Sequence, residues 1–163
     1  MRSESERVVD AVINASPLIL LNKIGRLYLL NELFDSIFIP NSVLREIDPV
    51  NASELKVGLS GLSFIPLEVS NVIAVRGLLG RLHIGEVEVM VGAIEKSVST
   101  VILDDNAARN KAKQLGLEVT GTVGILLRAR RLGLISDIGP ELNKLISVGM
   151  YLSDELIMKI LNF

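Results

Sequence analysis

The sequence predicts an α/β fold in which helices cover both faces of a parallel sheet of four or five strands. Two observations predict it. Short aliphatic runs of strand length alternate with segments of helical hydrophobic spacing along most of the chain. Hydrophobic residues make up 49% of the sequence and aromatic residues only 4%, which is typical of strands buried on both faces. Right-handed crossovers then place all strand exits on the same edge of the sheet.

The expected strands are short runs rich in β-branched residues. They span residues 8–13, 36–39, 62–67, 100–103 and 117–119. We expect four or five strands in the sheet, because Pro66 interrupts the third of these runs. Proline cannot donate to a strand ladder, so we expect this run at an edge of the sheet. Gly77 and Gly80 indicate irregular chain before the next helix.

The expected helices begin at capping residues and end at helix-breaking ones. Ser16 before Pro17 is a favourable helix start, and Gly25 ends this first helix. The others are expected at about 27–34, from Asn41 or Ser42 to Val50, from Gly85 to about Ser97, from Asp105 to Gly116, from 125 to Gly133, at 140–146 and from Ser153. The 163 residues then form one domain, with a core at about 8–135 and a C-terminal helical extension at about 136–163.

The composition excludes several classes of site. The chain has no cysteine and a single histidine, His83, which excludes disulfides, thiolate chemistry and a histidine-rich zinc site. A net charge of −2 argues against a generally basic nucleic-acid binder. No apolar run reaches membrane-spanning length, and the polar segment 1–7 does not resemble a secretory signal. We therefore expect a cytoplasmic protein that does not bind membranes.

Two adjacent acids, Asp104 and Asp105, stand where an apolar strand ends and a helix begins. Ligands of parallel α/β proteins bind at the carboxyl ends of the strands, and two carboxylates there suit a hard divalent cation. Aspartate is also a preferred helix N-cap, and acids suit the positive end of the helix dipole. On this stretch alone, capping is the simpler interpretation.

Three further polar residues are expected at the same edge. Glu86 shares a helical row with Val89 and Met90, so it points inward, although acids also favour a first helical turn for its dipole. Glu46 lies beside the apolar row of its helix, where a partly exposed acid is the alternative. Asn14 follows the first strand, where a turn-forming role is the alternative.

This ordered set of motifs resembles the PIN-domain family, and more closely its VapC-like members in archaea and bacteria. The motifs that carry the resemblance are Asn14 to Ile19, Glu46 on the helix after Pro40, Gly85-Glu86, Ile102 to Arg109 and Thr120 to Thr122. They cover about residues 8–135. The resemblance implies a three-layer α/β/α sandwich and a group of acids that binds Mg²⁺ or Mn²⁺ to cut RNA.

By position, the resemblance also implies roles for individual residues. Asn14 falls where the first acid of the family lies, Glu46 at the second, Glu86 at the third, and Asp104 or Asp105 at the fourth. Asn14 offers an amide oxygen to a metal but has no negative charge and cannot act as a base. The supporting polar groups would be Ser16, Thr120 and Thr122, and Arg109 is expected to pair with one of the acids or to contact phosphate.

The leading hypothesis is a Mg²⁺- or Mn²⁺-dependent endoribonuclease, with the toxin of a toxin–antitoxin pair as one form of it. Its partners would be RNA, an antitoxin and a second copy of the chain. The dimer interface would consist of the helices at 17–34 and the C-terminal segment. The alternative is a non-catalytic nucleic-acid- or partner-binding module with a degenerate acidic site. A receiver-like domain also fits acids at strand ends, but it lacks a Lys–Thr/Ser arrangement. The low aromatic content argues against base recognition by stacking.

Overall fold

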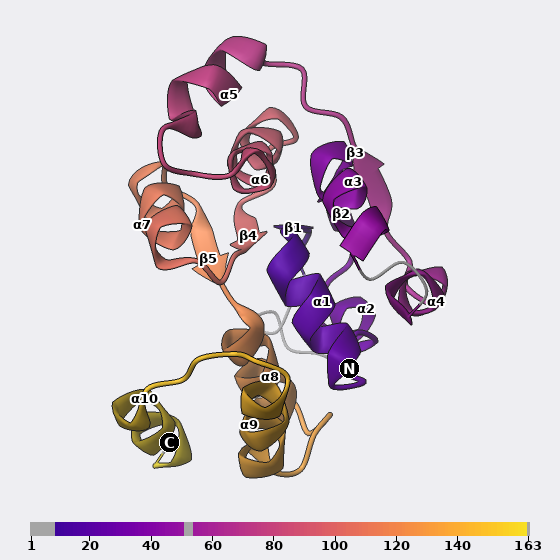
Figure 1. Cartoon of the computed structure of the whole chain (residues 1–163), viewed down its shortest axis with the longest axis vertical. Coiled ribbons are helices and arrows are strands. Elements are labelled where there is room, and N and C mark those ends of the chain that lie inside the picture. Colours follow the sequence, from indigo (N-terminus) through magenta and orange to yellow (C-terminus); the bar gives the residue numbers. More distant parts are fainter. Residues whose placement is uncertain (1–8, 51–53, 163) are drawn as a thin grey trace.

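A five-stranded parallel sheet forms the centre of the molecule (Figure 1). This computed structural model describes residues 9–50 and 54–162, except for the side chains of residues 48–50 and 54. The strands are β1 (Ala11–Ile13), β2 (Ile37–Pro40), β3 (Ile65–Leu67), β4 (Thr100–Ile102) and β5 (Glu118–Thr120), in the spatial order β3-β2-β1-β4-β5. All neighbouring pairs are parallel, so the predicted fold class is confirmed with five strands.

The edge position predicted for the strand with Pro66 is also confirmed. In the described part of the chain β3 pairs only with β2, and Pro66 lies opposite Ile39 in that ladder. β1 is shorter than the expected strand 8–13, which begins at a residue outside the described part of the chain. The ends of the other expected and observed strands differ by at most three residues.

Helices cover both faces of the sheet, as the three-layer prediction requires (Figure 1). They are α1 (Ala15–Lys23), α2 (Leu29–Leu33), α3 (Asn41–Val50), α4 (Glu54–Ser60), α5 (Val72–Leu79), α6 (Ile84–Glu95), α7 (Asn106–Gln114), α8 (Thr122–Arg131), α9 (Ile138–Ser147) and α10 (Asp154–Leu161). On one face, α6 contacts β1, β2 and β4, while α7 contacts β5. On the other face, α8 contacts β5, α1 and α2.

The irregular chain predicted around Gly77 is wrong, because α5 runs through this glycine. The Asn71 side chain caps the helix by accepting a hydrogen bond from the Ala74 amide (3.0 Å), and Gly80, with φ of 40°, ends it. Val75 of this helix packs in a small apolar cluster with Val87 and Val91 of α6. Tertiary packing therefore offsets the unfavourable intrinsic helix propensity of glycine.

The main core is one aliphatic cluster around the sheet. Val12, Ile13, Val101 and Ile102 are fully buried in it, and the C-terminal helices contribute further buried residues. None of the helices in residues 9–50 and 54–162 combines the length and the apolar character needed to cross a bilayer.

A partly buried ion pair attaches α9 to the turn that follows α1. Arg26 donates to both carboxylate oxygens of Glu141, from Nε to Oε2 (3.0 Å) and from Nη2 to Oε1 (2.8 Å). Lys144 Nζ lies 3.4 Å from Oε1, and the Glu141 residue is only 3% exposed. The guanidinium of Arg26 is the main reason that the pKa of Glu141 lies below its usual range.

Candidate active site

The exits of β1 and β4 lie side by side at the carboxyl edge of the sheet. Ile13 is in register with Ile102, and the amide of Asn14 donates to the Ile102 carbonyl (3.1 Å). One residue further along, the amide of Leu103 donates to the Thr120 carbonyl (2.9 Å). These bonds bring the chain after three separate strands to one place, as the parallel topology predicted.

A pocket of about 480 Å³ opens at this edge. Its polar side consists of Asn14, Ser16, Glu86, Asp104 and Asp105. Its other side is uncharged and consists of Ile19, Leu20, Val148, Gly149, Met150 and Tyr151. The structure thus brings together four of the five residues predicted to hold a metal, and Glu46 lies next to them as described below.

Three donors fix the carboxylate of Asp104. The Thr122 amide donates to Oδ1 (2.8 Å), the Thr122 hydroxyl donates to Oδ2 (2.7 Å), and the Ser16 hydroxyl donates to Oδ2 (3.2 Å). A Cβ on Gly121 would lie 2.8 Å from Oδ1, so only glycine leaves room for the carboxylate here. Ser16 and Thr122, both predicted as supporting groups, thus contact Asp104.

Asp105 is the N-cap of α7, because its Oδ2 accepts a hydrogen bond from the Ala108 amide (2.9 Å). The capping interpretation is thus confirmed for Asp105, whereas the Asp104 side chain accepts from Ser16 and Thr122. Asp105 is exposed and still lines the pocket.

Arg109, on the first turn of α7, lies beside these acids. Its Nη1 donates to the carbonyl of Leu103 (2.9 Å), so its contact is with the backbone after β4. A Cβ on Gly121 would lie 2.7 Å from this nitrogen and 2.8 Å from Asp104 Oδ1. The guanidinium and the Asp104 carboxylate therefore both lie close to this glycine.

Glu86 is buried, with 7% of its surface exposed, in the first turn of α6. Its Oε2 accepts a hydrogen bond from the His83 amide (3.1 Å), which satisfies one free donor of the helix start. Burial raises its pKa above the usual range, the charges of Asp105 and Glu46 raise it further, and the His83 amide opposes them. Glu86 is therefore both a first-turn acid and a member of a repelling acidic group.

Glu46 approaches the same group from α3. It is exposed and lines a separate pocket with Ser42, Arg45, His83 and Ile84. A Cβ on Gly85 would lie 3.0 Å from Glu46 Oε2 and 3.2 Å from Asn14 Oδ1, so both oxygens lie above this glycine. Glu46 and Asn14 are thus neighbours, on the border between the two pockets.

Asn14 is the residue that best indicates a cation. The helix after it begins at Ala15, so Asn14 occupies the N-cap position predicted for Ser16, yet its side chain makes no capping bond. Asn14 is 9% exposed, and among the described residues its buried Oδ1 has no hydrogen-bond partner. An unpaired buried oxygen destabilises the fold by about 1–3 kcal/mol, which a bound cation would offset.

The oxygens at this edge fit a hard divalent cation in their chemistry. Mg²⁺ and Mn²⁺ prefer carboxylate and amide oxygens, and all five candidate residues offer them. Within residues 9–50 and 54–162, however, no three acidic or histidine side chains lie in an arrangement already able to hold a metal.

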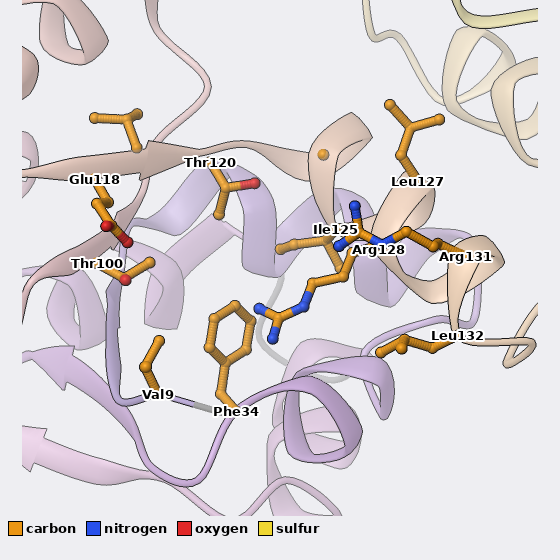
Figure 2. Close-up of a pocket in the computed structure, with 12 residues that line it drawn as sticks. Val9, Phe34, Thr100, Glu118, Thr120, Ile125, Leu127, Arg128, Arg131 and Leu132 are labelled. Carbon is orange, nitrogen blue, oxygen red and sulfur yellow. The ribbon is translucent and has the colours of Figure 1, made fainter. Parts of the chain in front are cut away.

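Thr120 does not lie in the acidic pocket, where a supporting role was expected. It lines another pocket, of about 460 Å³, which extends from the amino ends of β4 and β5 along α8 (Figure 2). There Arg128 places its guanidinium over the Phe34 ring, 5.5 Å from the centroid. A Cβ on Gly124 of α8 would meet the Thr120 hydroxyl, so this side chain faces α8 rather than the acidic pocket.

Glu86→Gln is expected to stabilise the metal-free protein at pH 7 by about 0.5–2 kcal/mol, the usual range for a single stabilising substitution. Glutamine keeps an acceptor for the His83 amide but removes the buried charge. Because the folded pKa of Glu86 is raised, its ionisation costs stability as the pH rises from the unfolded pKa through the folded one. The stability that Glu86→Gln gains over the wild type should therefore shrink as the pH falls toward 4.

Thermal unfolding in EDTA measures this effect, with Glu88→Gln on the same helix as the control. A lower Tm for Glu86→Gln at pH 7 would mean that Glu86 is only a structural first-turn acid.

A PIN-domain family model matches residues 10–163, so the chain belongs to the PIN-domain family. The solved structures include a match to a PilT N-terminus domain protein from the hyperthermophilic archaeon Sulfolobus solfataricus P2. That match has a TM-score of 0.52 and 20% identity, and it covers 72% of this chain and 90% of the other. It supports the fold. No curated protein sequence is significantly similar to the chain.

PIN domains are generally nucleases that use divalent metals, so membership in the family makes this chain a nuclease-type module.

The uncharged side of the pocket was not predicted from the sequence. Residues 148–151 follow α9. Their local sequence does not indicate that they pack beside Asn14 and Asp104, which lie more than 40 positions earlier in the chain.

Proposed function

We propose that this protein is a Mg²⁺- or Mn²⁺-dependent endoribonuclease. The observation that carries the proposal is the unpaired, buried oxygen of Asn14 among the carboxylates of Glu46, Glu86, Asp104 and Asp105. Repulsion within this group destabilises the metal-free protein and favours a cation.

In this proposal, each residue of the site has a separate task. Asn14, Glu46, Glu86, Asp104 and Asp105 hold the ion. When bound, the ion supplies Lewis-acid stabilisation of phosphate charge and a water of lowered pKa. Ser16 and Thr122 fix the Asp104 carboxylate, so its charge is preorganised. Arg109 holds a positive charge beside Asp104, where it screens the acid or contacts a phosphate.

RNA cleavage with and without metal tests the proposal. The full chain is expected to cut a labelled single-stranded RNA in Mn²⁺ or Mg²⁺ and to lose this activity in EDTA. Titration calorimetry with Mn²⁺ should show binding at micromolar to millimolar concentration.

The second candidate is a non-catalytic module, which the missing charge at Asn14 favours. It would neither bind Mn²⁺ nor cut RNA, so the same two measurements decide between the candidates. A role as a toxin, a cytoplasmic location, an antitoxin partner and a homodimer stay predictions, and light scattering tests the homodimer.

A further inference from the structure

The acidic pocket has two chemically different sides. Carboxylates line one side, whereas the side formed by α1 and by the link between α9 and α10 has no charged residue. A nucleotide has the same division, since its phosphate is anionic and its base is uncharged. A phosphate held by a cation on the acidic side would thus place a neighbouring base near the uncharged side.

The link carries an aromatic residue, Tyr151, which is 87% exposed. It is one of only two tyrosines in a chain that has no tryptophan. Its neighbour Met150 is half-buried, and methionine adapts its shape to varied apolar surfaces. An aromatic face beside a phosphate-binding site is the usual platform for an unpaired base.

The backbone holds Tyr151 in place from both directions. Before it, Gly149 has φ of 104°, and the Met150 amide donates to the Leu145 carbonyl (3.0 Å), which closes the end of α9. After it, Leu152 is buried and Ser153 caps α10. Tyr151 therefore does not lie on a free chain end, and a base that stacks on its ring would require little further ordering of the backbone.

We infer that Tyr151 is a base-stacking residue of this site, and that it gives the site a preference for RNA with an unpaired base beside the bound phosphate. The inference rests on the proposed function, since the acidic side defines where the phosphate lies. It also revises the expectation that the low aromatic content argues against base recognition by stacking, because one well-placed aromatic residue is enough for one base.

Tyr151→Ala should weaken binding of single-stranded RNA about 5- to 150-fold, which corresponds to the 1–3 kcal/mol of one stacked base. Tyr151→Phe should bind like the wild type, because it keeps the ring. Duplex RNA should bind all three proteins alike, since paired bases do not reach the ring. In the cleavage assay, Tyr151→Ala should raise KM more than it lowers kcat.

The probe is a short single-stranded RNA with one 2-aminopurine, titrated with the full-length protein in Ca²⁺. Stacking should quench its fluorescence in the wild type and in Tyr151→Phe, but not in Tyr151→Ala. Ile73→Ala, which truncates an equally exposed side chain (85%) on α5, is the control for lost apolar surface.

The outcomes separate the inference from the proposed function. Equal binding and quenching by wild type and Tyr151→Ala, or no RNA binding by the wild type, overturns the inference. Binding and ring-dependent quenching without any metal-dependent cleavage supports the stacking role while it overturns the nuclease proposal.

Discussion

Arg26→Met is expected to lower the free energy of unfolding by up to about 3–5 kcal/mol, the loss typical when a buried charge is left without its partner. Glu141 would keep a buried carboxylate whose only remaining cationic partner among the described residues is Lys144, at 3.4 Å. Methionine keeps much of the apolar stem of arginine, so the loss comes mainly from the charge. Urea unfolding of both proteins at pH 7 measures it.

The double variant Arg26→Met/Glu141→Leu is the control. Apolar replacement of a complete buried pair is often neutral, so the double variant should regain most of the lost stability. Lys144→Met, which removes the more exposed cation, should lower the free energy of unfolding by less than about 1 kcal/mol. A loss below about 1 kcal/mol for Arg26→Met would show that the pair contributes little.

The pH profile provides an independent check of the same pair. The folded pKa of Glu141 is lowered, so its contribution is fully present above the unfolded pKa of about 4.3. It is lost as the pH falls from there through the folded value. Wild type should therefore lose its advantage over Arg26→Met on acidification, whereas a constant difference between pH 7 and pH 3 would contradict this origin.

The sequence predicted the sheet because its signals are local. A parallel strand buried on both faces is an aliphatic run, and the position of β3 at an edge follows from Pro66 alone. The same kind of reasoning failed for α5, where Gly77 indicated irregular chain. There the packing of Val75 against Val87 and Val91 stabilises the helix, and local propensities give no information about this contact.

The candidate site could be predicted in part for a similar reason. Residues directly after parallel strands share an edge, which brings Asn14 and Asp104 together without any knowledge of side chains. The ion pair of Arg26 with Glu141, 115 positions apart, depends on how the helices of the outer layer pack. The position of Tyr151 depends on the same packing, so it too needed the structure.

The double substitution Asp104→Asn/Asp105→Asn should lower kcat/KM for RNA cleavage by at least about 10²–10³-fold, the loss that one preorganised electrostatic group at a reacting centre causes. The fold should survive. An asparagine side chain at position 104 can accept from the Thr122 amide through its oxygen and donate through its nitrogen to the hydroxyls of Thr122 or Ser16. At position 105, asparagine caps a helix as well as aspartate does.

The matched control is Asp137→Asn, which makes the same change at the exposed N-cap of α9, outside the pocket. It should keep both cleavage and Tm. The double variant should keep a Tm within a few degrees of the wild type in EDTA, but lose the Tm increase that Mn²⁺ gives the wild type. If the double variant cuts RNA at the wild-type rate, the two acids do not hold the metal, and the proposed metal site is contradicted.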